Sequence, residues 1–161
     1  MSTPDSDDAA ARAALEKFRQ SGISLDREGR FWHEGEEVTH AGLKRAFHRW
    51  IDRLADGRYV LRLDEKRYVY LDVEDAPVVV RSLHWQGDRV FATLPDGSEE
   101  ELDYGSLRLS QLGAAYTRVR GGRLEARLAP SAWNVLMRAV SDDGAGPCLE
   151  AARQRWPIAI G

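Results

Sequence analysis

Apolar residues recur every three or four positions in three stretches of the chain, and this spacing predicts three amphipathic helices. The first covers residues 9–20, and the last runs from Pro130 or Ser131 through Val140. We expect the middle helix to be capped by Thr39 and to end before Gly57. Its predicted buried face is the clearest of the three and consists of Leu43, Phe47, Trp50, Ile51 and Leu54.

Elsewhere the apolar period falls to two, which is typical of strands with one buried face. Glycine, proline and aspartate separate the strands and predict turns. Residues 78–85 are predicted as one strand. The full set of predicted strands is 23–25, 30–32, 58–63, 66–73, 78–85, 89–94, 99–103, 114–120 and 123–128.

The sequence allows a register to be predicted for two hairpins. Gly121 and Gly122 favour a tight turn, which sets Arg118 opposite Glu125 and Tyr116 opposite Arg127. A turn at Asp64-Glu65 would set other pairs face to face. Those pairs are Tyr59 with Tyr70, Leu61 with Tyr68, Val60 with Val69 and Arg62 with Arg67.

The order strand, Gly-Arg turn, strand, helix occurs twice, at Gly29-Arg30 and at Gly122-Arg123. The pattern predicts an α+β fold of two similar small halves, each an antiparallel sheet plus a helix. Duplication would explain it, and so would chance. The predicted segments are an N-terminal tail and helix (1–22), a first half (23–77), a second half (78–140) and a Gly-rich C-terminal tail with one helical turn (141–161).

Composition and charge narrow the function classes. The chain has 161 residues, of which 43% are hydrophobic and 30% charged, as in an ordinary globular protein. The net charge of −3 argues against nucleic acid as a partner. Cys148 is the only cysteine, so an intrachain disulfide and a cysteine-rich zinc site are excluded. We expect no membrane span, no signal peptide at the acidic N-terminus, and a cytoplasmic protein without metal or cofactor.

The motifs that accompany catalysis are incomplete. His33-Glu34-Gly35-Glu36-Glu37 begins like a zinc-protease motif but lacks the second histidine. No Gly-x-Ser-x-Gly elbow is present, and Ser106 has no histidine beside it in sequence. We therefore expect no catalytic centre, although a triad assembled from distant residues stays open.

The strongest candidate for binding chemistry is cationic. One face of the Gly121-Gly122 hairpin gathers an excess of arginine, which suits phosphate or carboxylate, beside a tyrosine that could stack a base. The alternative is a solvated face neutralised by acidic loops. In the first half, Arg62 would face Arg67 beside Lys66. These like charges would need a counter-ion between them, either a bound anion or the carboxylate of Asp64 or Glu65. The residues on the arginine-rich face are Tyr116, Arg118, Arg120, Arg123, Glu125 and Arg127.

Five segments resemble the bacterial domain-of-unknown-function family 1285. They are Trp32-His33-Glu34-Gly35, residues 43–47 of the predicted helix, Asp56-Gly57-Arg58-Tyr59, Val73-Glu74-Asp75-Ala76-Pro77, and residues 116–124 with Val119-Arg120-Gly121-Gly122. The resemblance implies a duplicated α+β core whose C-terminal half is pleckstrin-homology-like. It also implies a site at the interface of the halves, a nucleotide-like ligand and a role in signalling.

Taken together, these features predict a non-catalytic ligand-binding or sensing protein for an anionic, nucleotide-like small molecule. Arg118, Arg120 and either Arg67 or Lys66 would hold the phosphate. Tyr116 or Trp32 would stack on the ligand, and His33 with Glu34 would make polar contacts. A protein–protein interaction module and a hydrolase-like enzyme with a scattered site are the alternatives.

Overall fold

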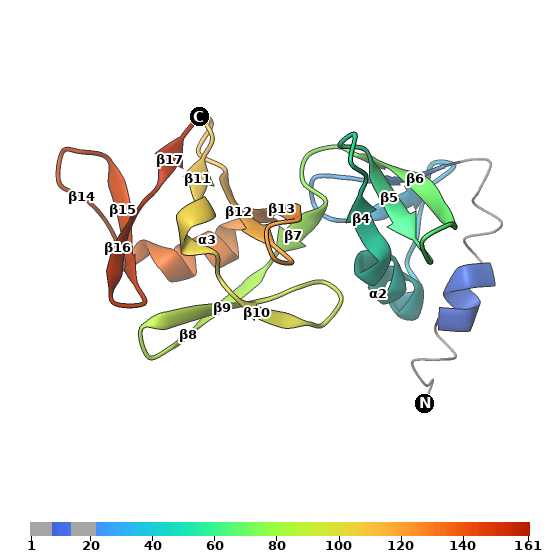
Figure 1. Cartoon of the computed structure of the whole chain (residues 1–161), viewed down its shortest axis with the longest axis horizontal. Coiled ribbons are helices and arrows are strands. Elements are labelled where there is room, and N and C mark those ends of the chain that lie inside the picture. Colours follow the sequence, from blue (N-terminus) through green and yellow to red (C-terminus); the bar gives the residue numbers. More distant parts are fainter. Residues whose placement is uncertain (1–7, 14–21) are drawn as a thin grey trace. The chain divides into compact units, whose positions relative to one another are not determined.

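The computed structural model describes residues 8–13 and 22–161. Over these residues the chain is an α+β protein of short, mostly antiparallel strands with few helices, so the predicted fold class is confirmed. Contacts divide the chain into two compact units, Met1–Pro77 and Val78–Gly161 (Figure 1). Residues 8–13 are helical, and the rest of the helix predicted over 9–20 lies outside the described residues.

One six-stranded sheet organises the first unit, in the order β3-β2-β1-β6-β5-β4. Only the β1–β6 pair is parallel. The helix α2 (Ala41–Trp50) packs against this sheet, where Phe47 meets Phe31 edge to face with ring centroids 5.4 Å apart. The strands are β1 (Ile23–Leu25), β2 (Phe31–His33), β3 (Glu36–Glu37), β4 (Ile51–Arg53), β5 (Tyr59–Arg62) and β6 (Tyr68–Val73).

The predicted bounds of α2 were wrong at both ends. His40, not Thr39, is the N-cap, and its Nδ1 accepts a hydrogen bond from Leu43 N. The helix ends at Trp50 because Ile51 begins β4 and pairs with Leu61 of β5. The β ladder thus replaces the last predicted helical turn. His48 is buried, with its ring centroid 4.6 Å from that of Phe31.

The register of the β5–β6 hairpin is shifted by one residue from the predicted one. The observed pairs are Val60 with Tyr70, Leu61 with Val69 and Arg62 with Tyr68. The Asp64 carboxylate causes the shift, because it accepts hydrogen bonds from the backbone N–H groups of residues 66 and 67 and so supports a longer loop.

The second unit holds three small sheets, with orders β10-β9-β8, β17-β11-β12-β13-β7 and β14-β15-β16. The helix α3 (Pro130–Met137) packs against β8 and β13, and Trp85 Nε1 donates to the Val135 carbonyl. The other elements are β7 (Val78–Val80), β8 (Ser82–Gln86), β9 (Arg89–Thr93), β10 (Glu99–Glu101), the 3-10 helix η1 (Tyr104–Ser106), β11 (Arg108–Leu109), β12 (Ala115–Val119), β13 (Leu124–Leu128), β14 (Val140–Asp142), β15 (Pro147–Ala151), β16 (Gln154–Pro157) and β17 (Ala159–Ile160).

Three predictions for this unit were wrong. The strand predicted over 78–85 breaks at Arg81, since β7 pairs with β13 whereas β8 pairs with β9. The helix α3 ends at Met137, whose side chain is exposed, and Val140 pairs with Leu149 in the next sheet. The Gly-rich segment after residue 142 forms strands instead of a helical turn.

The order of elements repeats between the units. The β1–β2 hairpin precedes α2 and the meander β4–β5–β6, and the β12–β13 hairpin precedes α3 and the meander β14–β15–β16. The pairing between sheets does not repeat, because β6 joins β1 whereas β14, β15 and β16 form a sheet of their own. Duplication and likeness to pleckstrin-homology folds stay predictions.

Candidate functional site

The arginine-rich hairpin has the predicted register. Arg118 lies opposite Glu125, and Tyr116 lies opposite Arg127. The alternating row of Thr117, Val119, Leu124, Ala126 and Leu128 is buried, as expected for the face that packs inward. Arg118 is exposed on the opposite face.

A pocket of about 390 Å³ lies beside this hairpin, within the size range of small-molecule sites. Its walls come from η1, β11, β12, β13 and β17, all in the second unit. Two of the predicted ligand-binding residues, Tyr116 and Arg118, line this pocket. The polar and aromatic residues that line it are Asp103, Ser106, Arg108, Tyr116, Thr117, Arg118 and Glu125.

Two hydroxyl groups join η1 to β12 at this pocket. Ser106 Oγ lies 2.9 Å from Thr117 Oγ1 and donates to the Asp103 carbonyl at 2.8 Å. The same Oγ accepts a hydrogen bond from Arg118 N at 2.8 Å. These partners include no general base, so they do not activate Ser106 as a nucleophile.

The cations at the pocket differ in their partners. Arg108 forms an ion pair with Glu125 and lies over the Tyr116 ring, 4.2 Å from its centroid. Tyr116 is only 8% exposed, so its ring is largely covered. The Arg118 guanidinium forms no ion pair with any residue in 8–13 or 22–161, and it is therefore the uncompensated cation of the pocket.

Arg120 occupies a different environment, although it is only two residues away. Its backbone has φ of 54°, in the left-handed region that begins the Gly121-Gly122 turn. Its N–H donates to both oxygens of the Glu100 carboxylate, at 3.0 and 3.1 Å, and its guanidinium lies 3.2 Å from Asp96 Oδ2. Acidic neighbours thus neutralise this arginine, which is the alternative that the sequence left open for the whole face.

The remaining predicted site residues belong to the first unit. Trp32 and His33 lie on β2, and Glu34 follows in the β2–β3 turn with φ of 52°. Lys66 and Arg67 lie in the loop between β5 and β6, where the Arg67 guanidinium binds the Asp64 carboxylate at 2.8 Å. An acidic residue therefore supplies the counter-ion there, as one of the two alternatives expected.

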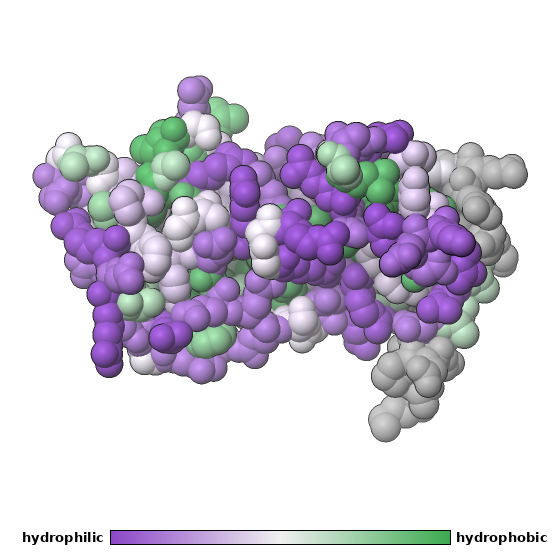
Figure 2. Space-filling model, viewed as in Figure 1, coloured by the Kyte–Doolittle hydropathy of each residue, from purple (hydrophilic) through white to green (hydrophobic). Residues whose placement is uncertain are grey.

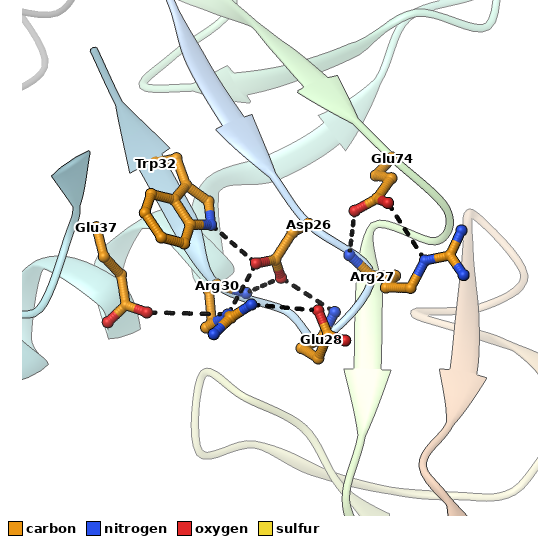
Figure 3. Close-up of polar contacts among 7 residues, drawn as sticks. All are labelled: Asp26, Arg27, Glu28, Arg30, Trp32, Glu37 and Glu74. Carbon is orange, nitrogen blue, oxygen red and sulfur yellow. Dashed lines mark hydrogen bonds and ion pairs between the residues drawn. The ribbon is translucent and has the colours of Figure 1, made fainter. Parts of the chain in front are cut away.

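Trp32 belongs to a hydrogen-bond network centred on Asp26, which sequence reasoning missed (Figure 3). Asp26 Oδ2 accepts from Trp32 Nε1 and from Arg30 Nε, both at 2.8 Å, and Oδ1 accepts from Arg30 N. Burial alone would raise the pKa of Asp26, but the hydrogen bonds from Arg30 and Trp32 outweigh it and lower the pKa. The carboxylate holds the β1–β2 turn, and an aspartate four residues before an arginine was the available signal.

The side chain of Glu74 reaches the same turn. Its carboxylate accepts from Arg27 N at 2.9 Å and from Arg27 Nε at 3.2 Å. The end of β6 is thereby joined to the β1–β2 turn, 47 positions away in sequence (Figure 3). This carboxylate has a structural role.

Neither metal clusters nor membrane-spanning helices are found in the described part of the chain. No group of three or more His, Cys, Asp or Glu residues in 8–13 and 22–161 could hold a metal ion. None of the helices in these ranges is long and apolar enough to cross a membrane.

Comparison with known proteins identifies similar folds. No family model matches the chain, and no curated protein matches it. A DUF1285 family protein from Silicibacter pomeroyi DSS-3 aligns with a TM-score of 0.73 and 19% identity, over 92% of this chain and 94% of that one. A DUF1285 family protein from Shewanella baltica OS155 aligns with a TM-score of 0.61 and 16% identity, over 74% of this chain and 93% of that one. The predicted resemblance is confirmed at the level of the fold.

Proposed function

We propose that this chain is a non-catalytic binding protein for an anionic small molecule, phosphorylated or nucleotide-like, and that its second-unit pocket holds the anionic group on Arg118. The observation that carries the proposal is the uncompensated Arg118 guanidinium on the pocket wall. Its neighbours Arg108 and Arg120 each have a carboxylate partner.

The chemistry around Arg118 suits such a ligand. A guanidinium presents a planar fork of donors that matches the oxygens of phosphate or carboxylate. Arg108, stacked on Tyr116, keeps a side chain that is 34% exposed, so a planar ring of the ligand can stack on its outer face. The hydroxyls of Ser106 and Thr117 add polar groups at the same wall.

A sensing role in signalling and membership in the DUF1285 family are part of this proposal. The sequence motifs and the fold shared with two DUF1285 family proteins support the membership. A site between the two halves, with Trp32, His33, Glu34, Lys66 and Arg67 as further contacts, stays a prediction of that resemblance.

A thermal-shift screen against nucleotides and phosphorylated metabolites tests the proposal. A ligand at 100 times its Kd stabilises the folded state by about 2.7 kcal/mol, which raises the melting temperature measurably. Arg118→Glu should abolish the shift. The control is Arg153→Glu, since Arg153 is an exposed arginine of the same unit that lines another pocket. A shift that survives in Arg118→Glu would contradict the assignment.

A protein–protein interaction module is the second candidate, favoured by a tyrosine and arginine surface on β5, on β6 and at Arg58, which precedes β5. Arg58 lies 4.6 Å from the centroid of Tyr70, and Arg62 lies 5.5 Å from that of Tyr68. Tyr70 is 49% exposed, and tyrosine and arginine are enriched at interfaces. Replacing both tyrosines with serine should then remove partner capture in a pull-down, whereas Arg118→Glu should keep it.

A further inference from the structure

Asp103 lies at the same pocket as Arg118 and is joined to it through one hydroxyl group. The Asp103 carbonyl accepts from Ser106 Oγ at 2.8 Å, and the Arg118 N–H donates to that Oγ at 2.8 Å. The two residues come from different elements, because Asp103 precedes η1 and Arg118 lies on β12. Backbone groups of an acidic and a basic residue therefore bind Ser106 Oγ.

The charged groups of these two residues do not pair. Asp103 is the N-cap of η1, yet its side chain makes no capping hydrogen bond. Within residues 8–13 and 22–161, neither its carboxylate nor the Arg118 guanidinium forms an ion pair with the other or with a third group. Both residues are exposed and line the pocket.

The remaining charges of the pocket cancel, since Arg108 and Glu125 form an ion pair. One uncompensated positive charge and one uncompensated negative charge are left, on Arg118 and Asp103. A polyphosphate carries several negative charges, and Asp103 would repel it while Arg118 alone attracted it. A ligand with one anionic and one cationic group satisfies both residues.

We infer that the pocket takes a small zwitterion of the amino-acid type, with its anionic group on Arg118 and its ammonium group on Asp103. The inference rests on the proposed function, because it uses the same pocket and the same arginine. It keeps the anion site on Arg118 but replaces the phosphorylated or nucleotide-like ligand with an amino acid, because Asp103 adds a second recognition point. The carboxylate of Asp103 accepts hydrogen bonds from an ammonium group, as the guanidinium of Arg118 donates to the anionic group.

Matched triplets of probes in a thermal-shift assay on the full chain test the inference. Each triplet contains an L-amino acid, the carboxylic acid that lacks its amino group, and the amine that lacks its carboxylate. Phenylalanine, 3-phenylpropanoate and 2-phenylethylamine form one such triplet. Adenosine 5′-monophosphate and inorganic phosphate represent anions without a cationic group. The expected result is a shift with at least one amino acid and little or none with its two partners.

Two variants separate the roles of the charges. Arg118→Gln and Asp103→Asn should each weaken binding of the amino acid about tenfold or more, since each removes one charge-assisted partner. Both keep the backbone groups that bind Ser106 Oγ. Arg153→Gln and Asp88→Asn are the controls, because they remove a base and an acid at another pocket of the same unit, and both should leave the shift unchanged.

The assay distinguishes a failure of the zwitterion inference from a failure of the proposed function. A shift with adenosine monophosphate or phosphate that needs Arg118 and ignores Asp103 would overturn the zwitterion and leave the proposed function intact. No shift with any probe, in a protein that melts cooperatively, would count against both.

Discussion

At the scale of single residues, Tyr104 shows how one side chain joins several parts of the second unit. Its ring stacks on Trp156 with centroids 5.3 Å apart. Its hydroxyl accepts from Val90 N at 2.9 Å and donates to Glu101 Oε2 at 2.8 Å. Burial raises the pKa of Tyr104 to about 12, because it disfavours the charged phenolate, and the nearby Glu101 adds to the effect.

This raised pKa predicts a loss of stability at alkaline pH. The unfolded chain releases the Tyr104 proton near its ordinary pKa of 10.0, whereas the folded chain keeps it up to about pH 12. The folded state therefore binds more protons in this window, and the free energy of unfolding falls as pH rises. Urea unfolding of the wild type and of Tyr104→Phe, measured between pH 10 and about 12, checks this prediction.

Tyr104→Phe serves as the reference for the wild type, since it lacks the titrating group. It should be less stable at neutral pH by about 1–3 kcal/mol, because Val90 N loses its buried acceptor. The gap between the two proteins should narrow with rising pH. A constant gap would show that Tyr104 ionises alike in both states.

At the scale of elements, the β15–β16 hairpin uses unusual turn residues. Ala151 pairs with Gln154, so the turn has two residues, Ala152 and Arg153, with φ of 49° and 61°. Turns of this type favour asparagine and glycine, which tolerate positive φ. The turn is held from outside, because Ala152 N donates to the Asp88 carbonyl of the β8–β9 turn at 2.7 Å.

Replacing the strained residues should stabilise the second unit. Ala152→Asn combined with Arg153→Gly is expected to raise the free energy of unfolding by about 1 kcal/mol, because the left-handed backbone then costs less. Gly87→Ala is the opposite control, since Gly87 has φ of 63° and open space around it, and it should destabilise by a similar amount. Denaturant unfolding measures both, and equal stability of all proteins would contradict the strain argument.

At the scale of the whole molecule, the candidate pocket belongs to one unit. Every residue that lines it lies between Asp103 and Ala159, and the unit has its own buried core. Hydrophilic residues predominate on the face seen in Figure 2, with small hydrophobic patches, one of them near the C-terminus, where Ile160 is exposed.

A fragment of residues 75–161 tests whether the second unit carries the binding site alone. We expect cooperative unfolding and the same ligand-induced shift as in the full chain, because the pocket is complete within the fragment. Circular dichroism establishes that the fragment is folded. A folded fragment without the shift would show that the first unit contributes contacts, as the predicted site between the halves requires.

The sequence predicted features correctly where they depend on interactions between neighbouring residues. The Gly121-Gly122 turn led to the correct register, and alternation placed Arg118 on the exposed face. The Asp64 carboxylate shifted the β5–β6 register, since side chains that bond backbone amides change the length of a loop. Asp103 and Arg108 were missed as pocket residues because η1 and β11 bring them to β12 from earlier in the chain.

The sequence by itself determined the α+β class, most strands and the arginine-rich face, because these follow from the alternation of neighbouring residues and from turn preferences. Only the tertiary structure decided which arginine keeps its charge uncompensated. Arg120 meets Asp96 and Glu100, and Arg108 meets Glu125, through contacts between separate strands and loops. A counter-ion is set by distance in space, and that distance depends on the packing of the whole second unit.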